Sequence, residues 1–249
     1  AFRMRPPLSW TRLPWAGSQP ALLAQDGDAA YFIDQQLKAI QAVDMAQAVK
    51  PAPKGMGPIY TFTSAYWEAD NTALLRAAGR ANIRHVQHHY GAAARRSGSG
   101  TSAPPVPRSI GIVTSFAFTH SVWEAICRDW VDMLRSADCP NTLYDIYGLA
   151  GASAQSGFQA VVSGPLTIED WITSLRDARH SILLYPEIGM DPTTMTLASL
   201  RLAPLQVASW GHPTTSGLPT IDRYLSADRF ETGDGDDHYV ETLVRLPGV

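Results

Sequence analysis

The stretch that decides the fold is SIGIVTSFAFTHSVWEAICRDWVDML, residues 109–134. Its first seven residues form a short apolar run, which is typical of a strand buried on both faces of a parallel sheet. Ser121 and Glu124 have the spacing of a capping box, in which two side chains bond backbone donors at a helix start. The apolar residues of that helix recur every three or four positions: Val122, Ile126, Trp130, Met133 and Leu134. A buried strand joined by a short loop to an amphipathic helix predicts an α/β fold.

The same alternation continues to the end of the chain. Short apolar runs predict further strands at residues 141–147, 158–162, 181–185, 205–210, 221–226 and 241–246. Between them, Thr167 caps a helix that runs to about residue 179, and Asp191-Pro192 starts one that runs to about residue 202. Strands that alternate with helices of this length predict a mainly parallel, right-handed, Rossmann-like sheet.

The chain before this half is predicted to be helical. Apolar spacing predicts helices at residues 20–49 and 64–79, the second with Trp67, and a third around Ile83 to Tyr90. The run RRSGSGTSAPPVP then has the composition of a flexible linker. We therefore predict a mainly helical region at residues 1–96, a linker at 97–107 and a Rossmann-like lobe at 108–249.

Composition excludes several classes of protein. Lys and Arg number 20 against 23 Asp and Glu, so the chain lacks the basic surface that nucleic-acid binding needs. The longest uncharged stretch, residues 146–168, is interrupted by Gly, Ser, Gln and Pro, which argues against a membrane span. The first twenty residues lack the apolar segment of a signal peptide. Two cysteines cannot form a disulfide framework, and free thiols indicate a reducing, cytoplasmic location.

Familiar ligand motifs are absent from the sequence. It contains no GxGxxG, GxxxxGK[ST], GxSxG or HExxH pattern. His85, His88 and His89 share a helix face, but no carboxylate or cysteine within a turn completes a metal site. Asp234-Gly235-Asp236 has the spacing of a metal–diphosphate element, yet it lies in an acidic, glycine-rich loop typical of a solvated turn. We predict no metal site.

Several separate motifs in the second half of the chain resemble one family. They are LYPEIGMDP (residues 184–192), RLAPLQV (201–207), WGHPTTSGLPTID (210–222), His238-Tyr239 and VRLPG (244–248), and HSVW (120–123) also fits. In this order they resemble the O-GlcNAc transferase and SPINDLY-like glycosyltransferases, in the bacterial branch related to adhesin N-glucosyltransferases. The resemblance covers about residues 109–249.

The resemblance implies a GT-B enzyme, in which a sugar nucleotide lies between two Rossmann-like lobes. This chain would be the N-terminal lobe, and the C-terminal lobe, which supplies most nucleotide contacts in the family, would be missing from it. The implied activity is an inverting, metal-independent transfer of a sugar to protein side chains. UDP-GlcNAc is the preferred donor, with UDP-glucose and GDP-fucose as alternatives. Serine or threonine acceptors lead, and asparagine is the alternative.

Candidate site residues lie in two loops. The loop Gly211, His212, Pro213, Thr214, Thr215, Ser216 and Gly217 offers amides and hydroxyls for sugar or phosphate oxygens, although it could also be an ordinary turn after a strand. His120 lies between a strand and a helix start, where ligands bind in such sheets. It is a general-base or acceptor-positioning candidate, and the alternative is a residue that only fixes the helix entry. Asp191 is read as a helix cap, and Glu187 is left without a role.

A second functional hypothesis competes with the enzyme. A single lobe with a helical region could dock a polypeptide or a partner subunit and carry out no chemistry. Its basis is the missing C-terminal lobe, and it needs no donor site.

Overall fold

The computed structural model describes residues 26–59, 61, 64–65, 69–95, 104–118, 120–149 and 157–247. In these residues seven parallel strands form one sheet, in the order β3-β2-β1-β4-β5-β6-β7. The strands are β1 (Val106–Thr114), β2 (Asn141–Asp145), β3 (Ala160–Ser163), β4 (His180–Tyr185), β5 (Leu205–Ser209), β6 (Arg223–Ala227) and β7 (Thr242–Leu246). The predicted parallel α/β sheet is confirmed, because every predicted strand overlaps an observed one.

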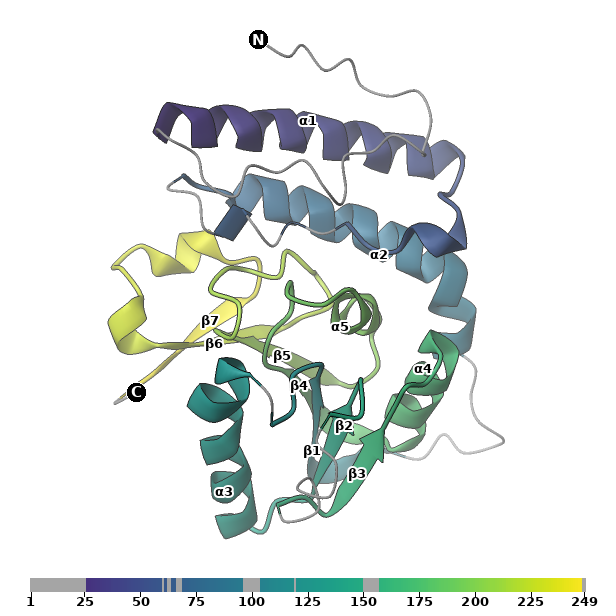
Figure 1. The fold of residues 1–249 in the computed structure, drawn as a ribbon, viewed down its shortest axis with the longest axis vertical. Coiled ribbons are helices and arrows are strands. Elements are labelled where there is room, and N and C mark those ends of the chain that lie inside the picture. The colour runs from purple at the N-terminus through teal and green to yellow at the C-terminus, as the bar shows by residue number, and fades with distance from the viewer. Residues whose placement is uncertain are drawn as a thin grey trace.

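Helices cover both faces of the sheet (Figure 1). One face packs against a π-helical turn, η4 (Trp123–Cys127), and the helix α3 (Arg128–Ser136) that continues it. The other face packs against α4 (Ile168–Asp177) and α5 (Pro192–Ala198). Side chains alternate along a strand, so Ile112 belongs to the first core and Val113 to the second. This explains why the strand reads as a continuous apolar run.

Helix α5 is shorter than the predicted helix 191–202. It starts as expected, with the Asp191 carboxylate accepting from the amides of Thr193 and Thr194 at 2.8 and 3.0 Å. It ends at Ala198 because the Gln206 side chain, and not a further helical turn, hydrogen-bonds the backbone groups that follow. The Gln206 amide donates to the Leu200 carbonyl and accepts from the Leu202 amide, both at 2.9 Å. A buried amide from β5 thus replaces helical hydrogen bonds.

The helical region contains α1 (Asp26–Val49), the short η2 (Lys54–Met56) and α2 (Thr72–Arg95). The prediction of separate helices at 64–79 and 83–90 was wrong, because α2 is one continuous helix that begins at Thr72. Its first amide is capped by Asp70 at 2.8 Å. The predicted helix end at Gly79 does not occur. This glycine lies inside α2, where the close approach of another segment leaves no room for a side chain. Residues 20–25, Trp67 and most of the linker lie outside the described residues.

Helix α2 lies between α1 and the sheet (Figure 1) and contacts both. Its backbone comes very close to the Gly211–Gly217 loop: a Cβ at Gly79 would lie 1.8 Å from the Gly217 carbonyl oxygen. Arg76 donates to the Tyr239 carbonyl at 3.3 Å, and Arg176 of α4 donates to the Ala93 carbonyl at 2.7 Å. The helical region is therefore held against the lobe near the predicted site. β1 begins at Val106, inside the predicted linker, and the three domain ranges stay a prediction.

The close approach at Gly79 gives a stability test with a control on the same helix. Gly79→Ala should lower the free energy of unfolding by about 1–3 kcal/mol or more, because the new methyl group meets rigid backbone. Gly91→Ala meets only the end of the flexible Arg95 side chain and should be neutral or stabilising by up to about 1 kcal/mol. Urea unfolding of both variants measures the difference, and equal losses would contradict the packing described here.

Candidate functional site

The order of the strands creates a switch point between β1 and β4. From β1 the chain moves outward through β2 and β3, then returns to β4 on the other side of β1. In open parallel sheets ligands bind at the carboxyl ends of the two strands that flank such a point. The loops after β1 (described at 115–118 and 120) and β4 (186–191) begin there, and the loop after β5 lies beside them. Both predicted site loops are thus at one edge of the sheet.

His120 caps the helix that follows β1. Its Nδ1 accepts from the Val122 amide at 3.1 Å, and its carbonyl accepts from the Trp123 amide at 2.9 Å. The predicted capping box was wrong: Ser121 lies beside the His120 ring, and Glu124 pairs with Arg128 instead. The imidazole takes the place expected for the serine hydroxyl, because the His120 ring lies over the first turn of the helix and accepts a backbone N–H there.

This cap determines which nitrogen of His120 carries a proton. Because Nδ1 accepts a backbone N–H, its lone pair is occupied, and the neutral ring carries its hydrogen on Nε2. In this arrangement Nε2 can donate a hydrogen bond but cannot accept a proton. The geometry therefore favours the positioning role of His120 over the general-base role. The adjacent helix start also attracts negative charge.

The Gly211–Gly217 loop is held against the loop that follows β4. The Gly211 amide donates to the Pro186 carbonyl at 3.0 Å. The His212 ring lies on Gly189, where a Cβ would come within 2.4 Å of the ring and where φ is +104°. Only glycine suits that position. The two loops are therefore packed tightly against each other.

His212 is buried, and its ring stays neutral at physiological pH. Removal from water lowers its pKa to about 4, because the charged form loses its hydration. The Tyr224 hydroxyl donates to the His212 carbonyl at 2.6 Å and holds its backbone in place. A neutral, enclosed ring is better suited to supporting the fold of the loop than to exchanging protons with a substrate.

Two of the three hydroxyls in this loop are engaged by a buried carboxylate. Thr215 donates to Glu241 at 2.5 Å, the Ser216 amide donates to it at 2.9 Å, and the Ser216 hydroxyl bonds it too. The Thr214 hydroxyl, by contrast, is buried and has no hydrogen-bond partner in the described part of the chain. Of the hydroxyls that the sequence offered for ligand binding, Thr214 alone has no partner among the described residues, and it is enclosed by the protein.

Sequence reasoning missed the two buried acids that organise these loops. Glu241 was read only as the start of a strand, and Glu187 had no role. Glu187 accepts from the Ser115 amide at 2.9 Å and from the Thr114 hydroxyl at 3.0 Å, which ties the loop after β4 to the end of β1. A signal was present in the sequence: both acids adjoin apolar strand segments, where an unpaired charge is costly.

The described residues also contain no metal-ligating cluster and no membrane-spanning helix. No three histidine, cysteine or acidic side chains in the described ranges are grouped so that they could hold a metal ion. In the Asp234–Asp236 element both carboxylates are exposed: Asp234 precedes the 3₁₀ turn η7 (Gly235–His238), and Asp236 lies within it. No described helix is long and apolar enough to cross a membrane. Cys127 and Cys139 are buried and free.

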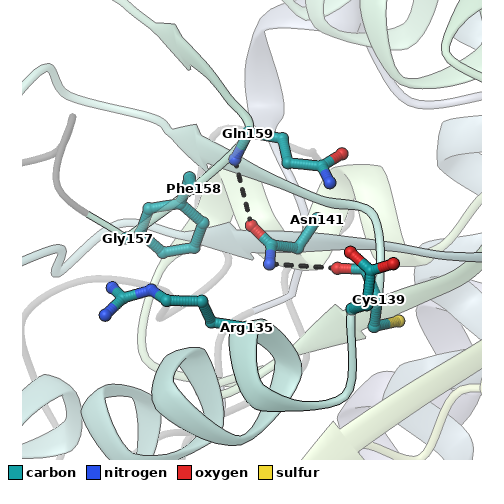
Figure 2. A pocket seen from close by; sticks show the side chains of 7 residues that line it. Arg135, Cys139, Asn141, Gly157, Phe158 and Gln159 are labelled. Atoms are coloured by element: carbon teal, nitrogen blue, oxygen red, sulfur yellow. Dashed lines mark hydrogen bonds between the residues drawn. The ribbon is translucent and has the colours of Figure 1, made fainter.

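A pocket lies at the opposite, amino edge of the sheet (Figure 2). It has a volume of about 200 Å³ and is lined by Arg135, Asp138, Cys139, Asn141, Gly157, Phe158 and Gln159. Asn141 bonds the Cys139 carbonyl at 3.2 Å and the Gln159 amide at 3.3 Å, so its side chain serves the fold (Figure 2). This pocket is remote from the switch point, and we assign the site to the carboxyl edge.

The fold and its loops define a Rossmann-like lobe with a topological switch point at its carboxyl edge. No family model matches the chain. A UDP-glucose:protein N-beta-glucosyltransferase from Actinobacillus pleuropneumoniae serotype 5b is 25% identical over 183 residues, covering 70% of this chain and 28% of that protein. A probable UDP-N-acetylglucosamine–peptide N-acetylglucosaminyltransferase SPINDLY from Oryza sativa subsp. japonica is 47% identical over 47 residues, 19% of this chain and 5% of that protein.

The structural comparison gives the same kind of relative. The fold matches a solved Thermobaculum terrenum O-GlcNAc transferase mutant with a TM-score of 0.55 and 17% identity, covering 88% of this chain and 44% of that one. The resemblance to O-GlcNAc transferase and SPINDLY-like glycosyltransferases is thus confirmed, and the relatives are protein glycosyltransferases. The chain spans less than half of the length of each relative.

The division among the loop hydroxyls can be tested with two isosteric variants. Thr215→Val removes a hydroxyl that pairs with Glu241 and should lower the free energy of unfolding by about 1–3 kcal/mol, because a buried acceptor loses its partner. Thr214→Val removes a hydroxyl without such a partner and should cost much less. Thermal unfolding of the two proteins decides. A larger loss for Thr214→Val would refute this assignment.

Proposed function

We propose that this chain is the N-terminal lobe of an inverting, nucleotide-sugar-dependent glycosyltransferase that modifies protein side chains. The observation that carries the proposal is the match of 70% of the chain to a protein N-glucosyltransferase. UDP-glucose with asparagine and UDP-GlcNAc with serine or threonine are the two donor–acceptor pairs, and both kinds of relative occur in the comparisons. GDP-fucose remains the third donor to test.

The chemistry assigns specific tasks to this lobe. In the transfer, the acceptor oxygen or nitrogen bonds the anomeric carbon from one side and releases its proton, while the diphosphate leaves from the other with the bonding electrons. Catalysis requires that the acceptor be held in line and that charge on the leaving group be stabilised. His120 can donate through Nε2 from a helix start, and the Gly211–Gly217 loop could offer backbone amides beside it. These groups would position the acceptor and the sugar.

The proposal includes the rest of the protein. A second lobe would supply most contacts to the nucleotide, so this chain alone should be inactive. The proposal also takes the transfer to be metal-independent, as the resemblance to the glycosyltransferase family implies. A reducing, cytoplasmic location completes the proposal and is supported by the two free, buried cysteines.

The activity is tested on the full-length protein with radiolabelled UDP-glucose, UDP-GlcNAc and GDP-fucose and a library of acceptor peptides. We expect sugar transfer from a UDP-sugar that continues in the presence of EDTA. Activity that EDTA abolishes and Mn²⁺ restores would overturn the metal-free reaction. Peptide binding without transfer from any donor would favour the docking module instead.

The role of His120 is tested by substitutions that distinguish its helix-capping Nδ1 from its Nε2 donor. His120→Asn keeps a side-chain acceptor at the helix start, whereas His120→Ala removes it and should cost about 1 kcal/mol of stability. Both variants lose the Nε2 donor, so both should lower turnover of the full-length enzyme by about 10²–10³-fold, the usual cost of one preorganised donor. Full turnover in His120→Asn would leave His120 as a cap only.

A further inference from the structure

Glu187 is a carboxyl group completely removed from solvent at the switch point of the sheet. Its exposed fraction is 0%, and its two oxygens accept from the Ser115 amide and the Thr114 hydroxyl. Burying a carboxyl group costs free energy that a well-packed apolar side chain would not incur. Its two bonds join segments 72 and 73 residues apart in the sequence. The group therefore fixes a tertiary geometry rather than a local turn.

From Glu187 a chain of contacts leads to His120. The Thr114 hydroxyl that donates to Glu187 also accepts from the Phe116 amide at 3.1 Å. The Phe116 ring packs against the His120 imidazole, with ring centroids 4.9 Å apart. The same imidazole caps the helix through Nδ1. The path of the loop between β1 and the helix thus depends on the carboxyl group beneath it.

On its other side the turn that carries Glu187 contacts the Gly211–Gly217 loop. The Pro186 carbonyl accepts from the Gly211 amide at 3.0 Å, and the His212 ring covers Gly189. The turn is closed on itself by the Met190 amide, which donates to the Glu187 carbonyl at 3.1 Å. One short turn is therefore wedged between the two loops that carry the candidate site residues.

We propose that Glu187 is a positioning residue that sets the His120 ring relative to the Gly211–Gly217 loop. This role rests on the proposed function, in which His120 and that loop face the acceptor and the sugar. Glu187 does not touch the substrate. It acts through Ser115, Thr114 and Phe116, and its loss should displace His120 while leaving the rest of the sheet intact.

The surroundings of Glu187 also predict how its charge depends on pH. Desolvation raises its pKa to about 8, the bonds from Ser115 and Thr114 oppose this, and Asp191 adds to it. Cys127 faces it from η4, and its own pKa is raised by burial and then by Glu187. The neutral His212 adds no opposing charge. Between pH 4.5 and about 8 Glu187 holds a proton in the native protein that it has released in the unfolded chain. The free energy of unfolding therefore falls as pH rises through this range.

The test uses the full-length protein with histidines labelled at the ring nitrogens and with His120→Asn to assign the signal. Glu187→Ala removes both bonds, and Glu187→Gln keeps an acceptor for Ser115 and a donor toward Thr114. Thr114→Val removes the hydroxyl that bonds both Glu187 and the Phe116 amide, and leaves the Ser115 bond in place. Tyr144→Phe is the matched control, because it breaks a buried bond to His180 on the other face of the sheet. Nitrogen shifts report the state of the His120 ring without any substrate.

We expect Glu187→Ala and Thr114→Val to shift the His120 Nδ1 signal and to lower kcat by about 10²-fold, the cost of holding the acceptor out of line. Glu187→Gln should retain the wild-type signal and most of kcat, and should lose the fall in stability between pH 4.5 and about 8. Tyr144→Phe should lower the melting temperature without moving the His120 signal.

Two results would overturn the proposal. One is a wild-type His120 signal in folded Glu187→Ala or, if that variant does not fold, in Thr114→Val. The other is a Tyr144→Phe shift as large as that of Thr114→Val, which would make the change a general effect of lost stability. If no donor supports transfer but the signals move as expected, the proposed function fails while the positioning by Glu187 stands.

Discussion

The backbone of α2 lies directly against the backbone of the loop after β5, and the arrangement of the site depends on this contact. Gly79 and Gly217 are both glycines at the point of closest approach, and a methyl group on either would collide with the other segment. Close-packed backbone tolerates no added volume, so the helix and the loop fix each other's position. The helical region is for this reason part of the site's support, even though it carries none of the groups proposed to meet the sugar.

Two buried carboxyl groups complete that support from below. Glu241 engages the loop after β5, and Glu187 joins the loops after β1 and β4. Their bonds replace the water that each acid loses, and each bond also specifies the path of a loop that no regular secondary structure holds. The site loops are therefore tied to buried carboxyl groups by hydrogen bonds, and the groups left to meet a ligand are few: the His120 Nε2 and nearby backbone amides.

Hydrogen bonds within the protein also limit the chemistry that this lobe can carry out. A histidine that caps a helix cannot also accept a proton at its outer nitrogen, so the cap turns His120 into a donor. A buried His212 stays neutral and structural. What the lobe offers is a set of fixed donors beside a helix start, which suits electron-rich oxygens of a sugar, an acceptor or a diphosphate. The similarity to protein glycosyltransferases agrees with that chemistry.

The sequence by itself determined the alternating α/β order, the strand positions, the caps at Thr167 and Asp191, and the edge of the sheet on which His120 and the Gly211–Gly217 loop lie. These features depend on local periodicity and on the rule that parallel strands end at one edge. Only the tertiary structure decided that α2 continues through Gly79, that His120 rather than Ser121 caps its helix, and that Thr215 and Ser216 serve Glu241. It also gave Glu187 its partners. Apart from the His120 cap, which is local, these outcomes depend on groups distant in sequence, 73 residues away for Thr114 and Glu187 and 25 for Ser216 and Glu241. A local pattern carries no information about which distant group will lie within hydrogen-bonding distance. That is set by the spatial order of the strands in the sheet and by the packing of the helices on it.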